Sequence, residues 1–174
     1  MSAATQLPSS PPRVLGIDPG LQVTGYAVLE ARNGSPFVVE AGVIRTVEDR
    51  ATTDLAPRLR ILYDGIVEVL DQFRPKTMAV EQLYAHYDHP RTAILMAHAR
   101  GVIFLAAAQR DIPVCSYNAT SIKKTVTGSG RASKEQIQFA VQRELGLANM
   151  PEPPDVADAL AAALCQFYVD KRTG

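Results

Sequence analysis

Four carboxylates lie at the ends of apolar segments, and their placement constrains this chain more than any other feature. Asp18 ends the run RVLGID, Glu81 ends TMAVE, and Asp155 and Asp158 open the Ala/Leu-rich segment PDVADALAAAL. Carboxylates repel one another, so a fold that collects four of them is unfavourable unless a cation offsets their charge. Hard oxygen ligands suit Mg²⁺ or Mn²⁺, and a pair of such ions cleaves phosphodiesters. The pattern therefore indicates a two-metal nuclease.

Each carboxylate also has a purely structural explanation. Asp18 fits an Asp-Pro-Gly turn, and Glu81, at the end of an apolar strand, is explained by a salt bridge to an arginine. Asp155 and Asp158 share one face of a first helical turn, where the helix dipole favours acidic residues. All four together, in this order along the chain, favour the metal site.

The composition describes a single domain. The chain has 174 residues, of which 47% are hydrophobic, enough for one domain with its own core and short for two. The longest uncharged apolar run, about residues 101–109, is far shorter than the ~20 residues that a membrane helix needs. Residues 1–12 lack the features of a secretory signal, and we expect a disordered tail there, followed by one domain at residues 13–170. We expect a cytoplasmic protein, with Cys115 and Cys165 reduced and no membrane partner.

The net charge of zero hides an uneven distribution along the chain. Residues 1–90 carry 8 basic and 11 acidic side chains, residues 91–143 carry 8 basic and 2 acidic, and residues 144–174 carry 2 basic and 5 acidic. The basic segment therefore lies in sequence between the second and third candidate ligands. A cationic surface beside an anionic metal site suits the binding of phosphates, although a run of basic residues more often forms only a solvated face.

Hydrophobic periodicity predicts alternating strands and helices. The expected strands are Arg13–Asp18, Val23–Glu30, Phe37–Arg45, Lys76–Glu81 and Ile112–Tyr117. The expected helices run from a cap at Asp54 to about Phe73, at about Arg91–Gln109, near Ala119–Thr125, at Lys134–Leu145 with a Ser133–Gln136 capping box, and at about Asp155–Val169. Asn33-Gly34 is a strong hairpin signal, so the first three strands should be antiparallel. The pattern predicts an α/β domain with a mixed five-stranded sheet flanked by helices.

Five motifs in this chain resemble the RuvC-type Holliday junction resolvases. They are GIDPGLQVTGYAVLE, VEQLYA, ARGVIFLAAAQRDIPV, IKKTVTGSGRASKEQIQ and PDVADALAAALC, and the resemblance covers residues 13–170. This family consists of bacterial crossover junction endodeoxyribonucleases with a ribonuclease-H-like fold. The resemblance implies a homodimer whose two active sites nick opposing strands of a four-way DNA junction during recombination and repair. It also implies a partner, the RuvAB branch-migration complex.

The resemblance assigns the metal site residue by residue. Asp18, Glu81, Asp155 and Asp158 match the family's catalytic, metal-binding carboxylates, and some members have a histidine at the position of Asp155. The chemistry that this implies is hydrolysis that leaves 5′-phosphate and 3′-hydroxyl ends. Two Mg²⁺ ions per active site are expected, and Mn²⁺ can substitute for them.

The resemblance also implies several DNA contacts. Lys123 and Lys134 match two family lysines needed for activity or DNA contact, and we expect one of them to offset charge on the phosphoryl oxygens. Tyr84 matches an aromatic position used against bases at the junction centre; the alternative is a half-buried loop tyrosine. The other expected DNA contacts are the basic residues Arg91, Lys124 and Arg131. The Ala/Gly-rich face of the helix at 91–109 is a candidate dimer contact, although core packing explains the same residues.

Three other classes of protein remain as alternatives. A nucleotide-binding domain of the actin or sugar-kinase kind also begins with Asp-x-Gly after a strand, but it usually needs a second, similar domain. A catalytically silent junction-binding protein would keep the fold, although all four carboxylates are present here. A ribonuclease-H-like nuclease that processes RNA is the nearest alternative, and Tyr84 with the IKKTVTGSG segment favours the resolvase over it.

Overall fold

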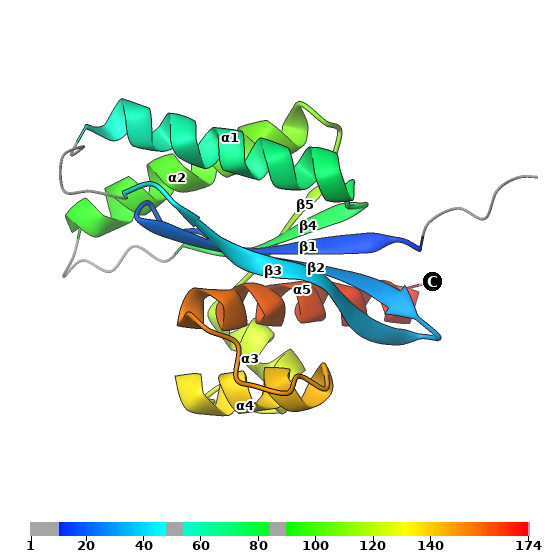
Figure 1. Cartoon of the computed structure of the whole chain (residues 1–174). Helices are drawn as coiled ribbons and strands as arrows, with labels where there is room; N and C mark the ends of the chain where they lie inside the picture. Colours follow the sequence, from blue (N-terminus) through cyan, green and yellow to red (C-terminus); the bar gives the residue numbers. More distant parts are fainter. Residues whose placement is uncertain (1–10, 48–53, 84–89, 174) are drawn as a thin grey trace, which may run out of the picture.

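A mixed five-stranded sheet lies at the centre of the computed structural model, which describes residues 11–47, 54–83 and 90–173 (Figure 1). The strands are β1 (Arg13–Asp18), β2 (Val23–Arg32), β3 (Ser35–Arg45), β4 (Thr77–Glu81) and β5 (Val114–Tyr117), in the order β3-β2-β1-β4-β5. Strands β1, β2 and β3 are antiparallel neighbours, whereas β4 is parallel to both β1 and β5. The predicted α/β fold with a mixed five-stranded sheet is confirmed.

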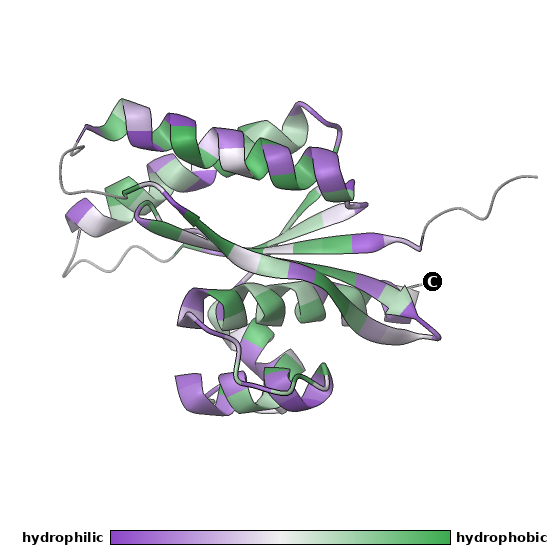
Figure 2. Ribbon diagram, in the orientation of Figure 1, coloured by the Kyte–Doolittle hydropathy of each residue, from purple (hydrophilic) through white to green (hydrophobic). Residues whose placement is uncertain are grey.

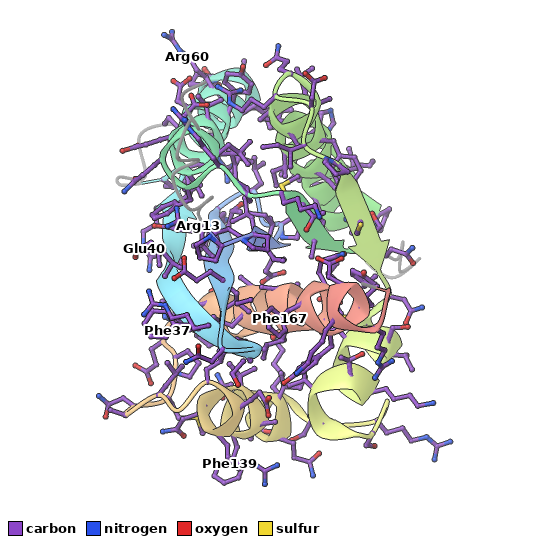
Figure 3. All side chains as sticks on the ribbon, turned by 90° about the vertical axis from the view of Figure 1, so that its right-hand side faces the viewer. Arg13, Phe37, Glu40, Arg60, Phe139 and Phe167 are labelled. Carbon is purple, nitrogen blue, oxygen red and sulfur yellow. The ribbon has the colours of Figure 1, made fainter. Side chains whose placement is uncertain are left out.

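Helices cover both faces of the sheet. They are α1 (Leu55–Phe73), α2 (Pro90–Ala108), α3 (Ala119–Thr127), α4 (Lys134–Glu144) and α5 (Pro154–Thr173). Helices α1 and α2 lie on one face, α5 lies on the other, and α3 and α4 pack against α5 on its outer side (Figure 1). Figure 3 shows the same layers from the side, with Arg60 projecting outward from α1 and Phe139 outward from α4.

The β2–β3 hairpin extends further than the sequence pattern predicts. Pairing continues to Arg32 and Ser35, directly at the turn, where Asn33 and Gly34 both have positive φ, 52° and 76°. Two left-handed residues in succession form the turn whose twist matches that of the flanking strands. The strands therefore continue to the turn, although Glu30 was the expected end of β2.

Helix α5 packs unusually close to the sheet because two strand residues are glycines. A Cβ on Gly16 of β1 would lie 2.1 Å from the backbone oxygen of Ala159, and a Cβ on Gly25 of β2 would lie 2.1 Å from that of Asp155. No side chain fits at these distances, so glycine is required for α5 to lie where it does. Figure 2 shows the middle of α5 as apolar and its first turn as hydrophilic.

Each face of the sheet is covered by its own cluster of buried apolar residues. Leu15, Ile17 and Val80 are buried against α1 and α2, whereas Val14 and Ala79 are buried against α5. Successive strand residues alternate between faces, so this burial pattern fixes the face to which every residue of β1 and β4 belongs.

The helix ends partly agree with the sequence prediction. The capping box of Ser133 and Gln136 at the start of α4 is confirmed. Asp54 occupies the N-cap position of α1, but its side chain makes no capping hydrogen bond, so that part of the prediction is wrong. Helix α5 continues beyond Val169 to Thr173.

Helix α2 is more apolar along its whole length than the run at 101–109 indicates. Among the described residues, it is the one helix long and apolar enough to cross a membrane by length and composition, and only 22% of the tested window is buried. Both cysteines are free, with Cys165 buried and Cys115 partly exposed. The tail expected at residues 1–12 lies almost entirely outside the described residues.

Candidate active site

Asp18 and Glu81 leave the sheet side by side. The pairing between β1 and β4 ends at Ile17 and Val80, and the next residue on each of these parallel strands is one of the two carboxylates. Because strand residues alternate, Asp18 shares the face of Gly16 and Glu81 shares the face of Ala79, which is the face covered by α5. The sheet therefore directs both carboxylates toward α5.

Helix α5 adds the remaining two carboxylates from its first turn. Asp18 pairs in register with Gly25, and the close packing of Gly25 on Asp155 places the start of α5 next to Asp18. Asp158 lines a cavity of about 440 Å³ together with Asp18 and Glu81. Asp155 is not part of the cavity lining. The structure thus brings Asp18, Glu81 and Asp158 together at one cavity and places Asp155 beside it, while their role as metal ligands stays a prediction.

The four carboxylates interact electrostatically. Burial raises the pKa of Asp18 to about 7, and the charges of Asp158, Glu81 and Asp155 add to this increase, while Lys134 opposes it. Carboxylates in a shared, partly buried site hold their protons more tightly because ionising all of them is unfavourable. Asp155 therefore contributes to the electrostatic field of the site, although it does not line the cavity.

Two lysines partly offset this negative charge. The pKa of Glu81 is raised by burial and by Asp158, and the pKa of Asp158 is raised by burial; Lys134 and Lys123 lower both values. Lys134 Nζ lies 3.9 Å from a carboxylate oxygen of Asp158, and both lysines line the cavity. The two lysines that the family resemblance implies therefore lie beside the carboxylates.

The donor set fits a divalent cation. All the clustered ligands are hard carboxylate oxygens, and each raised pKa reports charge repulsion or burial that a cation would relieve. Among the described residues, no group of three or more Asp, Glu, His or Cys side chains is close enough to hold a metal ion by itself. Mg²⁺ is usually held by one or two protein carboxylates together with waters and substrate phosphates, so the site fits a cation that is shared with a nucleic acid.

The turn that follows Asp18 is fixed by a hydrogen-bond network that the sequence did not reveal. Thr24 Oγ1 donates to the carbonyl oxygen of Gly20 at 2.6 Å. Arg58 of α1 donates to the carbonyl oxygen of Leu21 at 3.1 Å and to the hydroxyl of Thr46 at 3.3 Å. These bonds hold the chain on the carboxyl side of Asp18. No local pattern around Arg58 signals this role, because its acceptors are distant in sequence.

Arg100 is a second residue that sequence reasoning missed. It lines the cavity together with Glu81, and its guanidinium donates hydrogen bonds to the backbone carbonyl of Glu81 and to the hydroxyl of Ser116. Its charge lowers the pKa of Glu81. The residue appeared in the sequence only as one member of the basic segment.

Three of the remaining expected DNA contacts are exposed basic residues. Lys124 and Arg131 are exposed on α3 and on the loop before α4, and Arg91 is exposed in the first turn of α2; none of the three lines the cavity. Tyr84 lies outside the described residues. The structure thus separates two lysines at the carboxylates from three outer basic residues, whose DNA contacts remain predictions.

A mixed sheet with carboxylates at the ends of β1 and β4, joined by acidic residues at the start of α5, defines a ribonuclease-H-like nuclease site. The family model of the crossover junction endodeoxyribonuclease RuvC matches residues 14–166. The chain is 51% identical to the RuvC of Rhodopirellula baltica over 95% of this chain and 91% of that protein. This chain belongs to the RuvC family of crossover junction endodeoxyribonucleases.

Solved structures agree with this assignment. The structure of Thermus thermophilus RuvC has a TM-score of 0.81 and 31% sequence identity, covering 92% of this chain and 97% of that one. The structure of T. thermophilus RuvC in complex with a Holliday junction substrate has a TM-score of 0.83 and 30% identity, covering 92% and 96% of the two chains.

Proposed function

We propose that this chain resolves four-way (Holliday) DNA junctions as a metal-dependent endonuclease acting in recombination and repair in the cytoplasm. The observation that carries the proposal is the convergence of Asp18, Glu81 and Asp158 on one cavity that Lys123 and Lys134 also line. Membership of the RuvC family and the likeness to a relative solved with a Holliday junction substrate support the choice of substrate.

The carboxylates would hold the cations. We assign Asp18, Glu81, Asp155 and Asp158 to two Mg²⁺ ions per active site, with Mn²⁺ able to substitute. Bound divalent cations supply hydroxide near neutral pH and stabilise a leaving oxygen. Burial, together with repulsion by the neighbouring carboxylates, raises the pKa of Asp18 to about 7, and a bound cation would relieve both effects, which gives a physical reason for cation binding there.

Lys123 and Lys134 act on the scissile phosphate. Both line the cavity beside the carboxylates, so their ammonium groups can offset negative charge on the phosphoryl oxygens. Leu83, Met96 and Ile122 belong to the apolar part of the cavity lining. Hydrolysis with cleavage of the bond to the 3′-oxygen leaves a 5′-phosphate and a 3′-hydroxyl, which a ligase can rejoin.

The outer basic residues bind the arms of the junction. Arg91, Lys124 and Arg131 are exposed, and we assign them to phosphate contacts, which position DNA without reading its sequence. Tyr84 remains our candidate for stacking on a base at the junction centre. The RuvAB branch-migration complex is the partner expected to supply the junction.

A homodimer is part of the proposal, and α2 is its contact surface. Ile94 is 57% exposed and Leu105 is 52% exposed, and Ala97 and Gly101 between them are exposed too. Spacings of three and four residues place all four on one side of the helix. An exposed apolar stripe with small residues suits the close approach of a second α2. A twofold axis would then match the pseudo-symmetry of the junction.

The test is cleavage of an end-labelled mobile four-way junction, analysed on a denaturing gel with Mg²⁺ and with EDTA, beside Asp18→Asn. We expect paired nicks at symmetric positions that disappear in EDTA and in the variant. Tight binding with no nick under either Mg²⁺ or Mn²⁺ would instead identify a silent junction-binding protein. Cleavage of structured RNA with the junction left intact would identify an RNA-processing nuclease.

A further inference from the structure

The end of β4 that carries Glu81 extends one residue further along β5 than along β1. The recorded pairing of β4 with β1 stops at Val80, whereas the pairing with β5 continues to Glu81 opposite Tyr117. The next backbone amide, that of Gln82, donates to the carbonyl oxygen of Tyr117 at 2.7 Å. Glu81 therefore lies one residue beyond the recorded pairing of β4 with β1, and its carbonyl oxygen accepts a hydrogen bond from a side chain outside the sheet.

Arg100 of α2 is the residue that donates to this end of β4. Its Nη1 donates to the backbone carbonyl of Glu81, and its Nη2 donates to the Ser116 hydroxyl at 3.0 Å. The guanidinium carbon lies 4.6 Å from the centre of the Phe104 ring, one helical turn further along α2. One planar group is thus held by the ends of β4 and β5 and by an aromatic ring. We propose that Arg100 is a positioning residue that fixes the end of β4 and thereby orients the Glu81 carboxylate.

The planar fork of arginine is what this position needs. Two of the guanidinium nitrogens reach two acceptors on different strands at the same time, and the flat face rests on Phe104. A lysine has a single nitrogen on a flexible stem, so it keeps the charge without bridging both strands in this geometry. If only the positive charge of Arg100 matters, Arg100→Lys should retain activity. If the two hydrogen bonds of the guanidinium matter, Arg100→Lys should be impaired.

A direct phosphate contact is the competing role for Arg100. The residue does line the cavity, but two of its nitrogens already donate to protein acceptors, whereas Lys123 and Lys134 line the same cavity with ammonium groups. Groups that orient a ligand carboxylate affect activity strongly, by about 10–100-fold when substituted. A phosphate contact, in contrast, contributes mainly to affinity and to its dependence on salt.

The experiment compares Arg100→Ala, Arg100→Lys, Ser116→Ala and the double variant Arg100→Ala/Ser116→Ala. The matched control is Arg110→Ala, because Arg110 follows the same helix and pairs with Asp71 of α1. Three quantities are measured: the single-turnover cleavage rate of a four-way junction as a function of Mg²⁺ concentration, the junction Kd in EDTA, and the rise of Tm on adding Mn²⁺. Circular dichroism verifies that each variant is folded.

We expect Arg100→Ala to lower the saturated rate by about 10–100-fold, to raise the Mg²⁺ concentration that gives half the maximal rate, and to reduce the Mn²⁺-dependent rise of Tm. The junction Kd should stay within about twofold. Arg100→Lys should remain impaired, and Ser116→Ala should show a smaller loss. The double variant should be no slower than Arg100→Ala, because both changes remove the same bridge. Arg110→Ala should cleave like the unmodified chain.

Three outcomes would overturn the proposal: an unchanged rate in Arg100→Ala, full recovery in Arg100→Lys, or a loss of junction affinity as large as the loss of rate. If Arg100→Ala does not fold, Arg100→Lys and Ser116→Ala decide the same question. The inference rests on the proposed function, but the two can fail separately. Should the unmodified chain cut no junction, the proposed function fails, and the Mn²⁺-dependent change in Tm still tests the link between Arg100 and the Glu81 site.

Discussion

Replacing Asp18 with asparagine should stabilise the metal-free protein, and more so at high pH. The pKa of Asp18 is raised from 3.8 to about 7 in the folded chain. Below about pH 4 both the folded and the unfolded chain hold this proton, so the raised pKa of Asp18 does not reduce the free energy of unfolding there. Between about pH 4 and pH 7 the unfolded chain has already lost the proton while the folded chain still holds it, because ionising this buried carboxylate beside other carboxylates is unfavourable. Stability is therefore lost with rising pH.

The magnitude follows from the size of the shift. At 1.36 kcal/mol per pKa unit, a folded pKa of about 7 against an unfolded value of 3.8 amounts to about 4 kcal/mol at pH 8, of which about 2.6 kcal/mol develops between pH 5 and pH 8. The side chain lines an open cavity, so water screens part of this energy. We therefore expect the stability gain of Asp18→Asn over the unmodified chain to be about 1–2 kcal/mol larger at pH 8 than at pH 5.

The assay is urea unfolding in EDTA at pH 5 and pH 8, because the midpoint and slope together give the free energy of unfolding. The control is Asp64→Asn, since Asp64 lies on α1 with 64% of its side chain exposed and should show no such pH-dependent difference. A gain that is equal at both pH values, or larger at pH 5, would refute the argument.

Adding Mg²⁺ should raise the stability of the unmodified chain and have little effect on Asp18→Asn, because a ligand stabilises only the state that binds it.

Three further substitutions test the site from other directions. Glu81→Gln should abolish cleavage and preserve junction binding in EDTA, because the basic segment is separate from this ligand; a gel shift that shows lost binding would contradict that separation. Lys134→Ala should weaken junction binding or slow the reaction without moving the cut, since phosphate contacts carry little sequence information; mapping the nicks to the nucleotide would reveal a shifted position if Lys134 reads a base. Gly25→Ala should lower both Tm and the cleavage rate, because its Cβ would lie 2.1 Å from the backbone oxygen of Asp155 and must displace the first turn of α5; an unchanged Tm would show that α5 adjusts without cost.

Much of the site could be predicted from the sequence because it depends on strand periodicity. Asp18 and Glu81 each end an apolar strand, and the alternation of side chains along β1 and β4 then places both on the face of α5. The same reasoning fails for Arg58 and Arg100. Their acceptors include the backbone carbonyls of Leu21 and Glu81, which are far away in sequence and carry no residue-type signal. Only the assembled fold reveals such contacts.

The apolar character of α2 shows another limit of sequence reasoning. A composition rich in alanine and glycine predicts close packing, but it does not say whether the neighbour belongs to the same chain. In the structure Ala99 and Ile103 face the core, whereas Ile94 and Leu105 are exposed on another side of the helix. One face of α2 therefore packs in the core, while the other face is exposed and is the face that we propose for the dimer contact.

The two aspartates of α5 differ in how strictly the site constrains them. Asp158 lines the cavity, and one of its carboxylate oxygens lies 3.9 Å from Lys134 Nζ. Asp155 is outside the cavity lining, and its recorded influence on Asp18 is through charge. A carboxylate that influences Asp18 only by its charge is less constrained in position than a carboxylate that lines the cavity, so we expect the exact placement of Asp158 to matter more than that of Asp155.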